Sequence, residues 1–281
     1  MTRTLLFIGL LVVSLASCKK DGATPAYIHV NTPVVLDDNG HIVSSKIPDL
    51  WVYVNDKPAG VWEPGDAIPL IGEGPSRVKL IAGIRKNGIT DDRIQYPLYA
   101  TWEQELNLVP EQTLFFTPEF KYYENLRYWL ADFNTGLRFD TLDCTATMEL
   151  VASDSTLVDQ GLRNGRINLD LAHPLYRGVS SGDPFTNTGT VSFLEVDYRS
   201  DVPLLVGVSY YVAGNRQLFN YAYAVPTKKG DGSMPWNKVY FDMATPWNVS
   251  GAADKRFYIQ ASLEGATTGI MELDNIKLVQ P

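Results

Sequence analysis

Six polar and aromatic side chains in three strand-like segments have the chemistry of a sugar-binding surface. Within 193–199, 236–243 and 256–263, apolar residues alternate with residues that are mostly polar or aromatic. Because successive side chains of a strand point to opposite faces of a sheet, the polar and aromatic residues should share one face and the apolar residues the other. Tyrosine rings can pack against a sugar ring, while carboxylate, amine and amide groups can bind its hydroxyls. The candidate binding face consists of Glu195, Asp197, Lys238, Tyr240, Tyr258 and Gln260.

The same residues have a second interpretation, a solvated sheet face stabilised by charge pairs. Opposite charges on neighbouring strands stabilise the pairing, as Glu195 and Lys238 would do if they lay side by side. In either interpretation the alternate residues are expected to form the core. These are Leu194, Val196, Tyr198, Val239, Phe241, Met243, Phe257, Ile259, Ala261 and Leu263.

The sequence contains no motif that predicts catalysis. It has no Gly-x-Ser-x-Gly elbow, no P-loop and no paired-histidine zinc helix. Its 3 histidines and 2 cysteines are too scattered to match transition-metal spacing. No pair of carboxylates stands out as the acid and base of a glycosidase. We therefore predict that the protein is not an enzyme and has no catalytic cofactor.

The N-terminal segment indicates a lipid anchor. An apolar run follows Arg3 and ends at Leu15-Ala16-Ser17-Cys18. The run is too short to span a bilayer. Its layout is similar to that of a bacterial lipoprotein signal peptide, in which the cysteine becomes the first, lipidated residue. We expect a signal peptide at 1–17, lipidation of Cys18 and a tether at 18–26.

The charged residues Lys19, Lys20 and Asp21 follow the cysteine. This start resembles surface lipoproteins of the Bacteroidota, which implies attachment to the outer membrane through the lipid and exposure at the cell surface. Each buried methylene of an acyl chain contributes about 0.8 kcal/mol, so several chains hold the protein firmly. The net charge of -8 disfavours a nucleic-acid partner.

Short strand-like segments separated by turn residues dominate the remaining sequence, which predicts an all-β protein. In the first part, the segments 50–54 and 61–62 flank a turn cluster, and an alternating strand follows at 77–84. This order resembles the small PEGA-like or immunoglobulin-like sandwich of Bacteroidota lipoproteins. We expect such a domain at 27–120.

The second part carries a different resemblance. It begins with an Asp132-Phe133 strand and ends with Leu273-Asp274-Asn275-Ile276-Lys277-Leu278. This resembles the jelly-roll β-sandwich of carbohydrate-binding modules and galactose-binding-like domains, in which the early and final strands pair. It implies a jelly roll at 121–281. It also implies a structural calcium ion, with Asp132 and Asp274 in the positions of its ligands.

Two functions agree with these patterns. The first is a non-catalytic, lipid-anchored accessory subunit that docks on an outer-membrane protein complex. The second is a glycan-binding surface lipoprotein of a polysaccharide uptake system, which the jelly-roll resemblance favours. Because the sequence identifies no exposed Trp/Tyr array, and the first domain resembles a spacer or docking module, the accessory role is the prediction and glycan binding the alternative.

Overall fold

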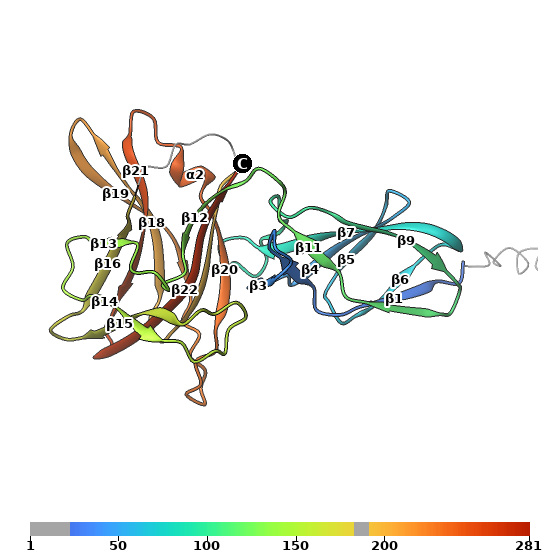
Figure 1. Ribbon diagram of the computed structural model, residues 1–281, viewed down its shortest axis with the longest axis horizontal. Helices are drawn as coiled ribbons and strands as arrows, with labels where there is room; N and C mark the ends of the chain where they lie inside the picture. Colours follow the sequence, from blue (N-terminus) through green and yellow to red (C-terminus); the bar gives the residue numbers. More distant parts are fainter. Residues whose placement is uncertain (1–22, 183–190) are drawn as a thin grey trace, which may run out of the picture.

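The chain folds into two β-sheet lobes that lie end to end (Figure 1). The computed structural model describes residues 23–182 and 191–281. Within these ranges, every regular element is a β-strand except the short helix α2 (Ala244–Trp247). The predicted all-β fold class is therefore confirmed.

The N-terminal lobe contains three small sheets. Their strand orders are β10-β1-β6, β11-β2-β3 and β5-β4-β7-β8, with β9 beside β7. The strands are β1 (Ala26–Val30), β2 (Val34–Leu36), β3 (Ile42–Val43), β4 (Asp49–Val54), β5 (Lys57–Trp62), β6 (Ala67–Leu70), β7 (Gly74–Arg85), β8 (Arg93–Gln95), β9 (Trp102–Leu108), β10 (Thr113–Phe116) and β11 (Glu119–Lys121).

The hairpin between β4 and β5 follows directly from its sequence. Leu50, Val52 and Val54 are buried, whereas the residues between them are only half-buried. Asn55 and Asp56 have φ angles of 49° and 63°. Positive φ angles at both central residues characterise the type I′ turn, which Asn and Asp tolerate well and which matches the twist of a two-residue hairpin. A turn is present where it is predicted, but it is shorter than the predicted cluster, because β5 begins at Lys57 and not at Val61.

The C-terminal lobe is a two-sheet sandwich. One sheet has the order β14-β15-β22-β17-β20, with β12 also paired to β22, and the other has the order β13-β16-β21-β18-β19. The strands are β12 (Arg127–Ala131), β13 (Phe139–Thr141), β14 (Met148–Ala152), β15 (Arg163–Asp170), β16 (Leu175–Ser180), β17 (Phe193–Ser200), β18 (Leu204–Val212), β19 (Asn215–Ala224), β20 (Asn237–Asp242), β21 (Ala253–Ser262) and β22 (Thr268–Gln280).

The strand order makes this sandwich a jelly roll. The four strands β15-β22-β17-β20 lie in one sheet and β16-β21-β18-β19 in the other. Along the chain, the connections from β15 to β16, β17 to β18, β19 to β20 and β21 to β22 therefore all cross between sheets. Eight strands in two sheets with such crossings form the jelly roll, and the predicted architecture is confirmed. The predicted pairing of early and final strands is also present, between β12 and β22.

The core of the C-terminal lobe consists of the alternating residues expected from the sequence. All ten predicted core positions, from Leu194 to Leu263, belong to its apolar cluster. Aromatic rings lie at one end of this cluster, where Phe257 packs edge-on to Trp129 and Phe139 at centroid distances of 4.9 and 5.9 Å.

The two lobes share buried side chains at their junction. The apolar cluster of the N-terminal lobe includes Phe193, Tyr240 and Val279 of the C-terminal lobe. Figure 1 shows β20 and β22 on the side of the C-terminal lobe that meets the N-terminal lobe, and β13, β16 and β19 on the other side. Thus the β13-β16-β21-β18-β19 sheet is the one whose outer face is directed away from the junction.

Candidate functional site

The predicted binding face is wrong as a single surface. Glu195 and Asp197 lie on β17, and Lys238 and Tyr240 on β20, in the sheet that meets the N-terminal lobe. Tyr258 and Gln260 lie on β21, in the opposite sheet. Alternation correctly separated these six side chains from the core, but it cannot show which sheet a strand joins.

Glu195 lies buried in the junction and accepts hydrogen bonds from the N-terminal lobe. The Tyr96 hydroxyl donates to its Oε1 at 2.6 Å, and the Tyr122 hydroxyl donates to the same oxygen at 2.9 Å. The hydroxyl of Tyr240 also accepts a hydrogen bond from the backbone N–H of Lys46 at 3.0 Å. These contacts connect the lobes, so this half of the predicted face is an internal interface.

Lys238 pairs with two acidic side chains of the junction. Its Nζ lies 3.5 Å from Glu195 Oε2 and 3.4 Å from Asp197 Oδ1, and all three side chains are almost fully buried. Burial raises the pKa of Asp197 even though Lys238 opposes it. Burial alone would lower the pKa of Lys238, but the two carboxylates outweigh it and raise that pKa. The charge-pairing interpretation is thus confirmed for Glu195 and Lys238, in a buried rather than a solvated setting.

The outer face of the β13-β16-β21-β18-β19 sheet, here called the free face, contains the other two predicted residues. Strand register places Gln260 between Arg177 and Leu205, and Leu205 beside Tyr223. Because directly paired residues point to the same side of a sheet, these four side chains form one cross-strand row. The neighbouring row runs through Asp140, Val179, Tyr258, Gly207 and Asn220.

Tyr258 organises the centre of the free face. A Cβ atom at Gly207 would lie 2.4 Å from the Tyr258 ring, so the glycine gives the ring room to lie across β18. The Tyr258 hydroxyl donates to Asn220 Oδ1. The Arg177 guanidinium lies 5.9 Å from the ring centroid, and Arg177 Nε donates to Gln260 Oε1 at 2.9 Å. Burial raises the pKa of Tyr258 to about 12. The Tyr258 ring is therefore buried beneath the surface of the free face and is not exposed to a ligand.

Tyr223 supplies the exposed aromatic ring that Tyr258 does not. Its side chain is 55% exposed. On the same sheet, the Arg216 guanidinium lies 5.2 Å from the centroid of the Tyr211 ring. A hollow of about 270 Å³ borders Arg216, Asp140, Thr141, Leu142, Val179, Asp254 and Arg256. The free face thus combines exposed aromatic surface with planar polar groups and carboxylates.

The sequence pattern did not identify Tyr223 because a bulge interrupts its strand. The pairing of β18 with β19 shifts between Val206 and Gly207, where Tyr221 is the extra residue of β19. A bulge reverses the parity of inward and outward positions, so simple alternation fails beyond it. The aromatic residues of β19 were the available signal, but their orientation needed the register.

The predicted calcium ligands lie near the pairing of β12 with β22. The Asp274 carboxyl is buried, its Oδ1 accepts the Asn275 backbone N–H at 2.8 Å, and its Oδ2 has no partner among the described atoms. Burial raises the pKa of Asp274 to about 7. Asp132 Oδ1 accepts the Asn134 backbone N–H at 3.2 Å. Residues 23–182 and 191–281 contain no group of three or more His, Cys, Asp or Glu arranged to hold a metal. Calcium binding stays a prediction.

Cys18 and the predicted signal peptide lie outside the described residues. In the described part of the chain, no helix has the length and apolar character needed to cross a bilayer.

No family model and no curated protein matches the chain. Among solved structures, it is similar to a family 29 carbohydrate-binding module in complex with cellulohexaose, with 12% identity, a TM-score of 0.37 and coverage of 56% of this chain and 93% of that chain. It is also similar to the family 11 carbohydrate-binding module from Clostridium thermocellum in complex with a β-1,3-1,4-mixed-linked tetrasaccharide, with 11% identity, a TM-score of 0.36 and coverage of 54% and 94%. The jelly-roll assignment rests on the strand order of this chain and does not depend on these similarities.

Proposed function

We propose that the protein is a non-catalytic, lipid-anchored surface protein that binds polysaccharide through the free face. The observation that carries the proposal is the row Arg177–Gln260–Leu205–Tyr223, in which an exposed tyrosine ring lies on the same face as a guanidinium and an amide. Such a ring can stack on a sugar, and the planar polar groups can bind its hydroxyls with defined geometry.

The arrangement of the lobes supports this proposal. The N-terminal lobe covers the sheet that contains Glu195 and Lys238, whereas the free face points away from it (Figure 1). The first described strand, β1, begins at the far end of the N-terminal lobe. A lipid on Cys18 would hold that end at the outer membrane, and the free face would point outward toward polysaccharide.

Replacing Tyr223 with alanine is expected to weaken polysaccharide binding about tenfold or more, since losing a stacked ring costs about 1.4 kcal/mol or more. Affinity electrophoresis through gels containing neutral polysaccharides would identify a glycan, and calorimetry would measure its affinity for both proteins. Phe115→Ala is a matched control, because Phe115 is an exposed aromatic residue of the N-terminal lobe. An equal loss in both variants, or no glycan that binds the wild type, would contradict the proposal and favour the accessory role.

The lipid anchor has a separate test. Cys18→Ala is expected to abolish incorporation of labelled palmitate and to release the protein from the membrane fraction, because the thioether needs the cysteine sulfur. Cys144→Ala is the control and should keep both properties. Labelled lipid on the Cys18→Ala chain would refute the assignment.

A further inference from the structure

A cleft lies between the two lobes and is separate from the free face. It has a volume of about 690 Å³, and β3 with its neighbouring loop residues forms one wall. The other wall comes from the β14–β15 loop and from the segment before β20, including Leu157, Val158 and Trp236. Clefts of this size at domain junctions are common ligand sites.

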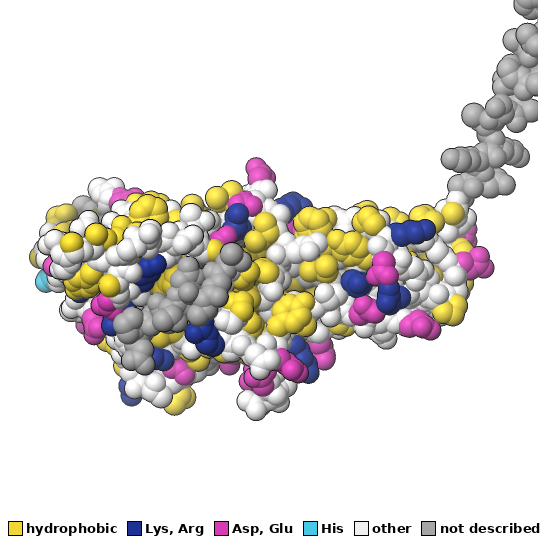
Figure 2. Space-filling view, turned by 90° about the horizontal axis from the view of Figure 1, so that it is seen from above, with side chains coloured by type: hydrophobic (Ala, Val, Ile, Leu, Met, Phe, Trp, Pro, Cys, Tyr) yellow, Lys and Arg dark blue, Asp and Glu magenta, His cyan; other side chains and the backbone are white. Residues whose placement is uncertain are grey.

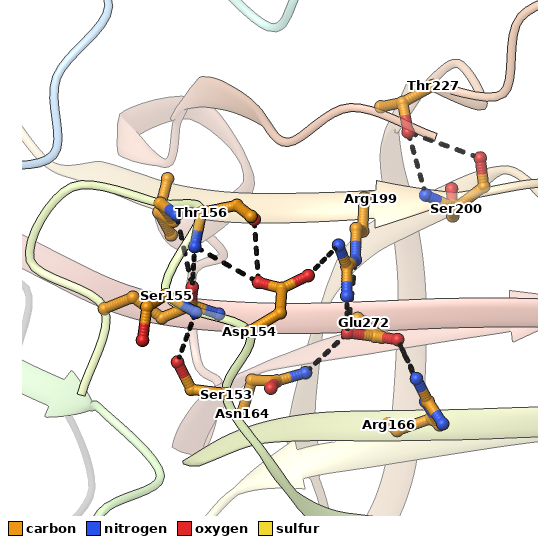
Figure 3. A network of polar contacts seen from close by, with 12 residues as sticks. Ser153, Asp154, Ser155, Thr156, Asn164, Arg166, Arg199, Ser200, Thr227 and Glu272 are labelled. Atoms are coloured by element: carbon orange, nitrogen blue, oxygen red, sulfur yellow. Dashed lines mark hydrogen bonds and ion pairs between the residues drawn. The ribbon is translucent and has the colours of Figure 1, made fainter. Parts of the chain in front are cut away.

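A network of charged residues fixes the wall that contains Leu157. The Asp154 carboxylate accepts hydrogen bonds from the backbone N–H and the hydroxyl of Thr156, at 3.2 and 2.7 Å. Arg199 Nη1 donates to Asp154 Oδ2 at 2.6 Å, and Arg199 Nη2 donates to Glu272 Oε2 at 2.6 Å (Figure 3). The loop is therefore anchored to the sheet before any ligand arrives.

The same network leaves the cleft without net charge. Among the described residues, Arg199 is the only titratable side chain that lines it. Behind the lining, Arg199 and Arg166 together balance the carboxylates of Glu272 and Asp154. The Arg199 guanidinium packs over the Trp236 ring at 4.9 Å from the centroid. A charged ligand would lose its hydration here without gaining an opposite charge, which is costly.

The remaining lining is aliphatic, with hydroxyl groups between the apolar side chains. Ile42 and Val158 are 50% and 54% exposed at the cleft, and Met234 lies in the same lining. A polyhydroxylated sugar would leave hydroxyls unpaired against these aliphatic groups, because the available planar polar side chain, Arg199, is already engaged. Apolar side chains of a peptide would instead bury this surface.

Backbone groups of an extended peptide would also find partners in the cleft. β3 is the edge strand of its sheet, and both of its residues line the cleft. An edge strand can accept an added strand from a partner.

From these observations, we infer that the interlobe cleft binds an extended, uncharged segment of a partner protein that carries bulky apolar side chains. This site is distinct from the proposed glycan site and gives the accessory interaction a location. Both lobes contribute to the cleft, so binding requires the junction to be intact.

Selection from a random decapeptide display library tests the inference. The library is selected on the immobilised full chain and then against a Val158→Asp variant, in which an exposed rim residue becomes charged with little effect on folding. Selected peptides should be rich in bulky apolar residues and poor in charged ones. Calorimetry should show at least tenfold weaker binding to Val158→Asp and unchanged binding to Leu171→Asp, a control at another exposed aliphatic residue.

Three results would overturn the inference. The first is that no selected peptide distinguishes the wild type from Val158→Asp. The second is that the peptides that do so are predominantly charged. The third is that a neutral oligosaccharide binds the wild type and loses its affinity in Val158→Asp but not in Tyr223→Ala, because the cleft would then be a sugar site.

Discussion

Replacing Lys238 with methionine is expected to lower the free energy of unfolding by about 3 to 5 kcal/mol. The methionine would fill similar space, but Glu195 and Asp197 would lose the cation that pairs with both of them and would keep only the charge of Lys277 nearby. Urea unfolding followed by circular dichroism would measure the loss. Lys228→Met is the matched control, because the Lys228–Asp201 pair is exposed and such pairs contribute less than about 1 kcal/mol. Equal losses in the two variants would mean that the buried cluster does not stabilise the junction.

The effect of the Lys238 substitution should depend on pH with a defined sign. The raised pKa of Lys238 means that the folded state holds the proton more tightly than the unfolded state does. This contribution to stability is complete below the unfolded-state pKa of about 10.4 and is lost as the pH rises above it. The difference between wild type and Lys238→Met should therefore narrow as the pH is raised from about 10 to about 12. A constant difference over this range would contradict the linkage.

Glu272→Gln is expected to lower the free energy of unfolding by about 2 to 3 kcal/mol. Glu272 is buried and accepts hydrogen bonds from Arg166, Arg199 and Asn164 (Figure 3). Hydrogen bonds that involve charged groups contribute about 1.5 to 3 kcal/mol each, and the amide would also turn a donor toward the guanidinium groups.

Asp154→Asn is the control for the Glu272 substitution. It changes a carboxylate bound to the same Arg199, but Asp154 is much more exposed, so the cost should stay below about 1 kcal/mol. Differential scanning calorimetry would compare the thermal stabilities of the two variants. If Asp154→Asn were the more damaging change, Glu272 would not be the centre of the network.

Alternation in the sequence predicted the two sides of individual strands but not what covers them. In β20, Val239 and Phe241 do face the jelly-roll core, and Lys238 and Tyr240 do face away from it. The sequence could not show that a second lobe covers that outer side, because alternation describes a single strand and its two faces. The tyrosines that bind Glu195 are about 70 to 100 residues away in the chain.

The candidate site was less predictable than the fold for two reasons. Tyr240 and Tyr258 belong to strands with the same alternation, yet the crossings of the jelly roll place them in opposite sheets. The exposed ring at Tyr223 follows a bulge that shifts the register of its strand. Both features depend on long-range pairing. Figure 2 shows acidic and basic side chains interspersed on the face that it presents, with no extended basic patch there.

The central place of β22 determines the order in which this protein can fold during its synthesis. Residues 268–280 pair with β12, β15 and β17, so one sheet of the jelly roll has a gap in its middle until they leave the ribosome. The strands of the N-terminal lobe can pair earlier, but Phe193, Tyr240 and Val279 complete their core. Neither lobe can therefore complete its core before residues 268–280 have been synthesised, and long-range pairing of this kind is slow.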